Sequence, residues 1–310
     1  MEGRLFPSSY QKLKHGGGFF LKKRKLDSVK AYVFLSPFLF FFSFMVLYPI
    51  IKGFDLSLKG QRGARMWYVG FDNYAKVLTD PKFWESFKIP AYLLLVQVPL
   101  MIFCAILIAL LLEKVEGRKG ATFFRLVYYI PSTIPAIVAA IIWGYMFSDS
   151  MSPFLPILNL VGFSGKLLTR EIVPLVMLII ILWQLTGYTA IMIYSSLLSI
   201  PKEYTEAATL DGAGYWQIAF RIKVPIIKDM LITLFIFNAI GALQVFNEPW
   251  MLGGLVVLPT NYTPAMYIYN SAFAHGRFTY AAAMGLILAA ITFLISFYFL
   301  KSATKEMFTE

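Results

Sequence analysis

The sequence has few charged residues. Asp, Glu, Lys and Arg make up 15% of its 310 positions, whereas soluble globular proteins have about 25%. Apolar residues make up 58%, and the mean hydropathy is +0.67. A soluble fold of this length would need more polar surface, and the charges here gather at the ends of long uncharged runs. The composition therefore predicts an all-α protein that crosses a membrane several times.

Residues that build catalytic or metal sites are also scarce. Cys104 is the single cysteine, so no disulfide can form within the chain. His15 and His275 lie far apart and accompany no HExxH or similar spacing, so no metal site is predicted. No GxxxxGK[ST] phosphate loop occurs. We expect no cofactor in this chain and no enzymatic activity, and if ATP drives the system, another chain must bind it.

Basic residues outnumber acidic ones and give a formal net charge of +11. Such a charge could indicate nucleic-acid binding, but basic residues beside apolar spans more often set membrane topology and contact the lipid bilayer. Residues 1–30 hold eight Lys or Arg, including Lys22-Lys23-Arg24-Lys25, and no signal-peptide cleavage site is obvious. They predict a basic cytoplasmic tail followed by an uncleaved first span. We therefore expect the lipid bilayer, and no nucleic acid, as a partner of these basic residues.

Six uncharged runs are each long enough to cross a bilayer, which takes about 20 apolar residues in a helix. Pro131 and Pro135 lie inside the third run and should kink it, which a membrane helix tolerates when neighbours satisfy the freed carbonyls. The runs form a predicted transmembrane domain over 31–300. Their expected bounds are about 31–51, 89–112, 126–147, 172–198, 230–247 and 278–300.

Two further stretches are expected not to cross. Residues 52–88 are polar and aromatic and should be structured, with Asp72 capping one short helix and Asp80-Pro81 starting another. Residues 249–276 carry no charge, but glycine and proline should break any long helix there, at Gly253-Gly254, Pro259 and Pro264. A seventh span there would place the C-terminus outside.

Six spans put both termini, the short tail 301–310 and the loop 199–226 on the cytoplasmic side. Of the 28 Lys and Arg, 18 then lie inside and 10 outside, as the positive-inside rule favours.

The loop 199–226 has the pattern of a helix, a turn and a second helix on the membrane surface. Pro201 favours a helix start, and Lys202 to Leu210 are reasonable helix formers. Gly212 can take the left-handed conformation that ends a helix, and Gly214 to Arg221 can form the second one. Ala207 and Ala208 offer a narrow face to another protein's groove, and Glu206 and Asp211 offer charges that fix register.

The spacing of this loop resembles the EAA loop of permease subunits of ABC importers. It comprises Glu206-Ala207-Ala208, Gly212, Ile222, Val224 and Pro225, with valine where leucine is usual. The resemblance extends over nearly the whole chain and narrows to carbohydrate importers, whose permeases are similar to the larger maltose permease subunit. Supporting stretches are Ala31-Tyr32-Val33-Phe34-Leu35-Ser36-Pro37, Tyr48-Pro49, Gly70-Phe71-Asp72-Asn73-Tyr74, Ser199-Ile200-Pro201 and Val245-Phe246-Asn247.

This resemblance implies a sugar permease with a six-span fold in the cytoplasmic membrane of a prokaryote. It also implies a second, similar permease, two ATP-binding subunits or one ATPase homodimer holding ATP and Mg, and an extracytoplasmic sugar-binding protein. The loop would then be a coupling helix docked on an ATPase subunit. Its expected coupling residues are Glu206, Ala207, Ala208, Asp211, Gly212, Ala213, Ile222 and Pro225.

Polar and aromatic residues inside spans are costly in lipid and usually face a cavity or another helix. Such residues suit sugars, because aromatic faces cover C–H patches and amides bond to hydroxyls. Gln184 and Asn238 could equally form hydrogen bonds between helices, and Trp183 could simply pack against its neighbours. Gln97 is a weaker candidate. The candidates for the substrate lining are Trp183, Gln184, Tyr188, Asn238, Gln244, Asn247 and Glu248.

By the same resemblance, Tyr188 falls where the maltose permease has a tyrosine that contacts sugar. Ala242 and Val245 fall where it has polar contacts, so maltose itself is not implied. Permeases for a polyol or glycerol phosphate, and ion-coupled secondary transporters, are the alternatives. None of the six predicted spans contains a Lys or Arg for a phosphate, and Glu248 is the sole acid near a span.

Overall fold

The computed structural model describes residues 32–117, 120–160, 162 and 165–307. The predicted basic tail at 1–30 lies outside the described residues, as do the last three residues of the chain. The described part divides into two units, which meet between Leu56 and Ser57, and each is described by itself.

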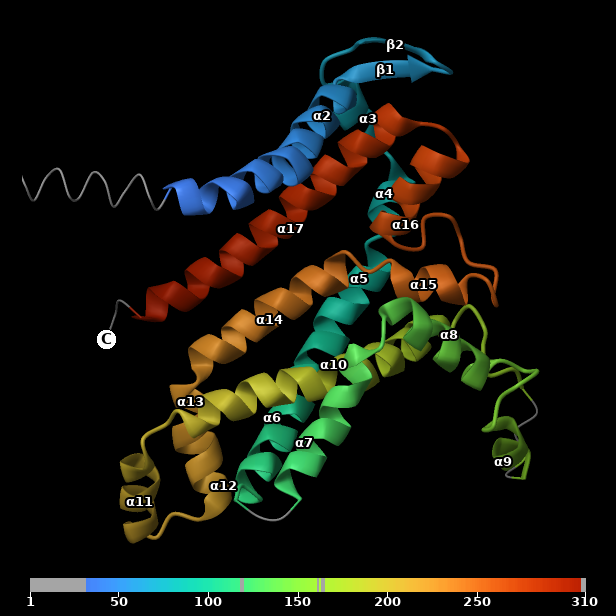
Figure 1. Ribbon diagram of the computed structural model, residues 1–310. Coiled ribbons are helices and arrows are strands. Elements are labelled where there is room, and N and C mark those ends of the chain that lie inside the picture. The colour runs from blue at the N-terminus through green and yellow to red at the C-terminus, as the bar shows by residue number, and fades with distance from the viewer. Residues whose placement is uncertain (1–31, 118–119, 161, 163–164, 308–310) are drawn as a thin grey trace, which may run out of the picture. The chain divides into compact units, whose positions relative to one another are not determined.

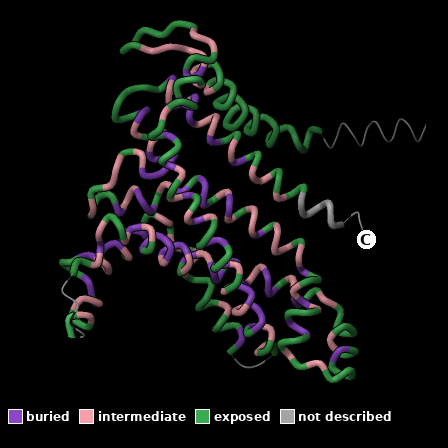
Figure 2. The backbone as a smooth tube through the Cα atoms, turned by 180° about the vertical axis from the view of Figure 1, so that it is seen from behind, coloured by how far each residue is buried: buried purple, intermediate pink, exposed green. Residues whose placement is uncertain are grey.

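The described part of the first unit is one continuous helix. It starts at Tyr32, includes the π-helical turn η1 (Ser43–Leu47) and continues as α2 (Tyr48–Ser57), whose last residue already belongs to the second unit. The helix is 26 residues long with a hydropathy of 2.1, enough to cross a bilayer. Its residues are almost all exposed, as the colouring of the backbone shows (Figure 2).

The second unit opens with a β-hairpin that the sequence did not predict. Strand β1 (Lys59–Arg62) pairs antiparallel with β2 (Arg65–Tyr68). The helix α3 (Asp72–Leu78) follows, and the Asn73 amide donates to the carbonyls of Ser57 and Lys59. Asp72 is the first residue of α3 and makes no capping hydrogen bond, so the prediction that it caps the helix is wrong.

A long helical stretch then runs from Pro81 to Lys114. As predicted, Asp80 and Pro81 start it: the Asp80 carboxylate accepts from the Lys82 N–H at 2.9 Å and so satisfies a free donor of the first turn. The helix begins before Ile89, the expected start of the second span. Its parts are α4 (Pro81–Glu85), α5 (Lys88–Tyr92), η2 (Leu93–Gln97) and α6 (Val98–Lys114).

The third predicted span is two helices rather than one kinked helix. The first comprises α7 (Ala121–Tyr129) and the 3-10 turn η3 (Ile130–Thr133), and the second is α8 (Ala136–Phe147). They meet at 94°. Pro135 has extended backbone and lacks an N–H, so the helical hydrogen bonds cannot continue through it. The described chain has five helices able to span a membrane, or six if this bent pair is one span.

The remaining helices follow in the predicted order. As predicted, residues 249–276 form short elements and no single long helix. After α9 (Leu155–Leu160) the elements are α10 (Val173–Leu198), α11 (Lys202–Leu210), α12 (Tyr215–Ile218), η4 (Ala219–Lys223), α13 (Val224–Ile226), α14 (Lys228–Leu243), α15 (Asn247–Leu252), α16 (Pro264–Tyr269), η5 (Asn270–Ala274) and α17 (Phe278–Met307). Figure 1 shows their arrangement.

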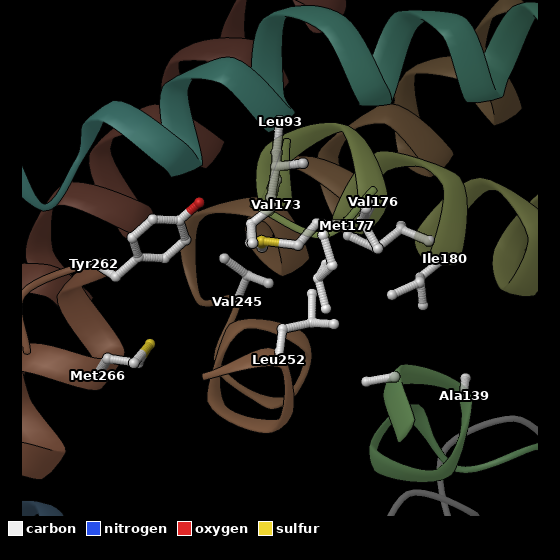
Figure 3. Close-up of a cluster of buried hydrophobic side chains, with 14 of the residues drawn as sticks. Leu93, Ala139, Val173, Val176, Met177, Ile180, Val245, Leu252, Tyr262 and Met266 are labelled. Carbon is white, nitrogen blue, oxygen red and sulfur yellow. The ribbon is translucent and has the colours of Figure 1, made fainter. Parts of the chain in front are cut away.

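Helix α10 organises the core, because apolar clusters pack along both of its halves. The Met177 cluster surrounds its first half with residues of η2, α8 and α15, including Leu93, Ala139 and Leu252 (Figure 3). The Ile193 cluster surrounds its second half with residues of α6, η4 and α14. Between the clusters, Gly187 touches α7: a Cβ there would overlap the Tyr128 carbonyl.

Candidate functional site

The 199–226 loop, called the EAA segment below, begins with the predicted helix. Pro201 (φ −56°, ψ 136°) directly precedes α11, which starts at Lys202. Ala208 is the buried residue of α11, at 8% exposure, so this side of the helix faces the rest of the protein. Glu206 and Ala207 are exposed. One face of the alanine pair is therefore free for another molecule.

The predicted turn after α11 is present. Gly212 has φ +80°, the left-handed conformation that glycine adopts without a steric cost. The Ala213 N–H bonds to the Ala208 carbonyl and the Gly212 N–H to the Thr209 carbonyl, both at 3.0 Å. This pair of bonds is the Schellman motif, which satisfies carbonyls left free at a helix end. The turn fixes the direction in which Asp211 and the next helix leave α11.

The second half of the EAA segment is longer than predicted. It starts after Gly214, whose N–H donates to the Gln217 side chain at 2.9 Å. Helical structure then runs through α12, η4 and α13 to Ile226, past the expected end at Arg221. Ile222 is half-buried in η4 and Pro225 is exposed in α13.

Three contacts that the sequence did not predict join this second half to the end of α6. The Lys223 ammonium lies 2.6 Å from a Glu113 carboxylate oxygen, with side-chain exposures of 9% and 16%. The Tyr215 hydroxyl donates to the Leu110 carbonyl at 2.6 Å. The Lys114 ammonium lies 5.4 Å from the centre of the Tyr215 ring. The one signal in the sequence was Lys223, a charge between apolar residues of the motif.

Burial of the Tyr215 hydroxyl, with the nearby Glu113 charge, raises the pKa of this group to about 12. Tyr215 therefore stays protonated at neutral pH and remains a hydrogen-bond donor to α6.

A neighbouring set of contacts fixes the turn between α6 and α7. Glu116 accepts a hydrogen bond from the Tyr194 hydroxyl of α10. The Arg125 guanidinium lies 3.4 Å from Glu116 and 5.3 Å from the centre of the Tyr194 ring. Thus α6, α7 and α10 are held together by polar contacts at the end that carries the EAA segment (Figure 1).

The outer surface of the EAA segment is partly apolar. Leu210 is 89% exposed, and Tyr204, Trp216 and Phe220 are also exposed. The Trp216 and Phe220 rings stack at 6.0 Å. Contiguous exposed apolar residues rimmed by polar ones typically mark a protein interface.

Two of the predicted substrate residues line one cavity between α10 and α14. The cavity has a volume of about 320 Å³ and is bordered by Tyr188 and Asn238, together with Leu185, Thr189, Met192, Met230, Thr233, Leu234 and Phe237. Tyr188 is 43% exposed, and its ring lies 6.5 Å from that of Tyr129. The Asn238 amide donates to the Leu234 carbonyl of its own helix at 2.7 Å.

Three other candidates are in contact with neighbouring residues. The Gln184 amide donates to the Ile134 carbonyl at 2.5 Å, so it bonds from α10 to the bend between η3 and α8. Trp183 packs edge to face on Trp143, with ring centres 5.7 Å apart. Gln97 is buried and donates to the Met101 sulfur at 3.5 Å.

The last three candidates lie beyond the end of α14, which stops at Leu243 and not at the expected Asn247. Gln244 borders a second cavity of about 450 Å³ with Phe246 and Tyr269. Asn247 is exposed and Glu248 is buried, both in α15. The structure therefore does not bring these residues to the cavity of Tyr188 and Asn238.

Another cavity, of about 630 Å³, was missed by sequence reasoning. It lies at the hairpin, with Trp67, Asp72, Asp80 and Arg277 among its lining residues. Asp80 accepts hydrogen bonds from the Tyr267 hydroxyl at 2.6 Å and the Tyr280 hydroxyl at 2.9 Å. Burial raises the pKa of Asp80, but these bonds and the Lys82 N–H outweigh it, so the pKa is lowered. The aromatic residues of 52–88 were the only feature of the sequence that pointed to this cavity.

Within the described ranges, no three His, Cys, Asp or Glu side chains are grouped so that they could hold a metal ion.

Comparisons with known proteins agree on one family. Residues 101–303 match the model of the family described as binding-protein-dependent transport system inner membrane component. The probable ABC transporter permease protein YurN of Bacillus subtilis is 30% identical over 90% of this chain and 99% of its own length. The lactose transport system permease protein LacF of Rhizobium radiobacter is 30% identical over 89% of this chain and 94% of its own length.

A solved structure has the same fold. It is that of a bacterial ABC transporter involved in the import of the acidic polysaccharide alginate, and a chain of it superposes with a TM-score of 0.79 at 22% identity. The match covers 92% of this chain and 98% of that one.

Proposed function

Since this chain belongs to the family of binding-protein-dependent transport system inner membrane components, we propose that it moves a sugar or oligosaccharide across the cytoplasmic membrane of a prokaryote. It is the membrane-spanning permease subunit of an ATP-driven importer. The names of its relatives support a carbohydrate. They include permeases for lactose, diacetylchitobiose and arabinooligosaccharides, between 27% and 31% identical to this chain.

The importer has further subunits. A second, similar permease completes the membrane part, and two ATP-binding subunits, or one ATPase homodimer, hold ATP and Mg on the cytoplasmic side, where both termini of this chain also lie. An extracytoplasmic binding protein delivers the sugar. One supporting observation is a solved alginate transporter that is in complex with a periplasmic protein bound to an alginate pentasaccharide.

The observation that carries the proposal is the exposed face of α11 and its turn. Glu206 and Ala207 are exposed and Ala208 is buried, so α11 presents a narrow ridge that fits a groove of the ATPase. The charges of Glu206 and Asp211 fix its register there. The EAA segment joins the ends of α10 and α14, which line the cavity of Tyr188 and Asn238. Closure of the ATPases would therefore move the two walls of the cavity.

A bulky residue at the tip should break this docking. We expect Gly212→Asp and Ala207→Leu to abolish uptake and the stimulation of ATP hydrolysis by binding protein and sugar, while the protein still accumulates in the membrane. A matched control is Gly63→Asp, another exposed turn glycine with positive φ (+60°) and nothing within 4 Å of a new Cβ, distant from the EAA segment in sequence. Normal uptake by both tip variants would refute the docking role.

For the substrate, we place Tyr188 and Asn238 first among the lining residues, because they share one cavity. Trp183, Gln184, Gln244, Asn247 and Glu248 remain candidates that the transport cycle would have to expose. Removing an aromatic face or an amide that contacts sugar should cost about 1.4 kcal/mol, or tenfold in half-saturation for uptake. Tyr188→Ala and Asn238→Ala test this, with Asn159→Ala, which removes an exposed amide of α9, as the control. An unchanged half-saturation in both test variants would place the sugar elsewhere.

A glycerol phosphate permease is the weaker alternative. Within the described part of the chain, no Lys or Arg borders the cavity of Tyr188 and Asn238, and a phosphate would want one. An uptake assay that compares neutral oligosaccharides with glycerol phosphate distinguishes the two.

A further inference from the structure

The two halves of the EAA segment are held differently. In α11 only Ala208 is buried. In the second half, Ile218, Ala219 and Lys223 are all buried, with exposures of 5%, 0% and 7%. The first half is thus presented to a partner, whereas the second half is packed into the protein. A force applied to α11 reaches α10 directly through residues 199–201, and it reaches the other membrane helices through the packed second half.

The second half carries one buried ion pair, between Lys223 of η4 and Glu113 at the end of α6. The pair joins residues 110 positions apart in sequence and is 2.6 Å long. Its low exposure means that water screens it weakly, so the attraction is stronger than at a surface. Removing one partner would leave the other charge buried and uncompensated, which is costly.

Glu113 uses only one of its carboxylate oxygens in this pair. Within the described residues, the other oxygen is buried and has no hydrogen-bond partner. A cavity of about 250 Å³ lies beside it, bordered by Lys202, Thr205 and Glu206 of α11. The Lys223 ammonium is therefore the group that balances the Glu113 charge, and a cavity lies between Glu113 and α11.

We propose that Glu113 and Lys223 are a positioning pair that carries the movement of α11 into α6, in addition to the covalent links to α10 and α14. This rests on the proposed function. Through the turn at Gly212, a displacement of α11 moves α12 and η4, and the pair passes it on to α6. Because α6 packs along α10 in the Ile193 cluster, both helices then move as one body. The Tyr215 bond to Leu110 holds the same junction in register.

The test uses the complete transporter, with its ATPase and binding protein, in proteoliposomes, and measures ATP hydrolysed per sugar imported. We expect Glu113→Gln and Lys223→Met to raise this ratio by about tenfold or more. ATP hydrolysis should continue in these variants, but the movement of α11 should reach α6 only weakly. The swapped double variant Glu113→Lys with Lys223→Glu should return the ratio to within about twofold of wild type, because it restores the pair. The control is Lys166→Met, which removes an exposed pair with Asp149 and should change nothing.

A merely structural role predicts something else: fewer assembled complexes, each with a normal ratio. The amount of complex recovered by size-exclusion chromatography separates these two outcomes. Glu113→Gln is the milder change, since its amide can still accept from Lys223, and it keeps the test decisive if Lys223→Met fails to assemble. A normal ratio in assembled Glu113→Gln complexes, or a swapped variant that stays uncoupled, overturns the proposal. Normal uptake by both Gly212→Asp and Ala207→Leu would instead overturn the docking role itself.

Discussion

The two apolar clusters along α10 differ in the polar contacts at their borders. Thr263 and Gln184 donate to backbone carbonyls beside the Met177 cluster, whereas a buried ion pair lies beside the Ile193 cluster. The Met177 cluster at the first half consists of apolar side chains, such as Val173, Met177 and Leu252, that are almost fully buried. The Ile193 cluster at the second half has a similar apolar interior but is bordered by directional contacts, among them Lys223 with Glu113 and Tyr215 with Leu110.

The difference separates stability from transmission. Packing between apolar side chains is non-directional, so helices in the Met177 cluster can shift slightly and pack again. Charge-assisted and buried hydrogen bonds depend on distance and angle, so helices bordered by them keep their register. We infer that the Met177 cluster mainly keeps the protein folded, whereas the border of the Ile193 cluster makes the EAA segment and α6 move together.

The junction between the clusters should be the most sensitive point. A Cβ at Gly187 would overlap the Tyr128 backbone carbonyl, which no side-chain rotation can relieve. We expect Gly187→Ala to destabilise the protein by about 3 kcal/mol or more, measured as thermal unfolding in detergent. The matched control is Gly241→Ala, in α14 with nothing within 4 Å of the new Cβ, which should gain up to about 1 kcal/mol. Equal stability of the two variants would contradict the close approach of α7 and α10.

A cavity in the Met177 cluster should lower stability without uncoupling transport. Met177 is fully buried, and Met177→Ala should cost about 2 kcal/mol of packing. The expected result is a lower unfolding temperature in detergent and an unchanged ratio of ATP hydrolysed to sugar imported in the assembled fraction. A changed ratio would show that the Met177 cluster also transmits movement, and the comparison between the clusters would fail.

The reverse result is expected at the border of the Ile193 cluster. Tyr215→Phe removes the hydroxyl that donates to Leu110 and should cost about 1 kcal/mol. Its ring still lies beside Lys114, so packing is retained. We expect a small change in unfolding temperature and a higher ratio of ATP to sugar. In the wild-type protein the pKa of the Tyr215 hydroxyl is raised to about 12. Titration of this hydroxyl should therefore not change the ratio of ATP to sugar between pH 6 and 9. If stability falls but the ratio stays normal, Tyr215 is only structural.

The smallest effect concerns the hairpin end. Tyr267 and Tyr280 donate to Asp80, and the pKa of Asp80 is lowered from its ordinary 3.8. A carboxyl group with a lowered pKa in the folded state stabilises the fold above its ordinary pKa, and this contribution is lost as the pH falls through the lowered value. Asp80→Asn should therefore cost under about 1 kcal/mol at pH 7. The difference from wild type should shrink toward pH 3 in thermal unfolding, and a constant difference would contradict the lowered pKa.

Long uncharged runs were sufficient to predict most helices, because a chain in lipid must satisfy its backbone hydrogen bonds internally. Helix α11 has the expected bounds, Lys202–Leu210, and Gly212 has the expected positive φ. These features depend on local chemistry: helix propensity, a proline before the helix and a glycine after it. The same local reasoning identified the start at Asp80 and Pro81.

Local patterns failed where the outcome depended on contacts. The hairpin of β1 and β2 has no alternation of apolar and polar residues, and it is anchored by Asn73. The prolines at 131 and 135 predicted a kink in one helix, but not the 94° angle between two helices. At this bend the Ile134 carbonyl accepts a hydrogen bond from Gln184 of α10, a contact that local sequence does not reveal. Helix α14 ends at Leu243, so three of the predicted lining residues lie beyond it and do not border the cavity of Tyr188 and Asn238.

The sequence by itself determined that the chain crosses a membrane, which helices do so, and that an alanine-rich ridge followed by a glycine turn connects α10 to α14. Hydrophobicity and backbone propensity act over a few neighbouring residues, so one sequence is enough to recognise them. Only the tertiary structure decided that Lys223 finds Glu113, that Tyr215 reaches Leu110, and that Tyr188 and Asn238 share a cavity. Those pairings join residues from distant parts of the chain, and packing sets their distances.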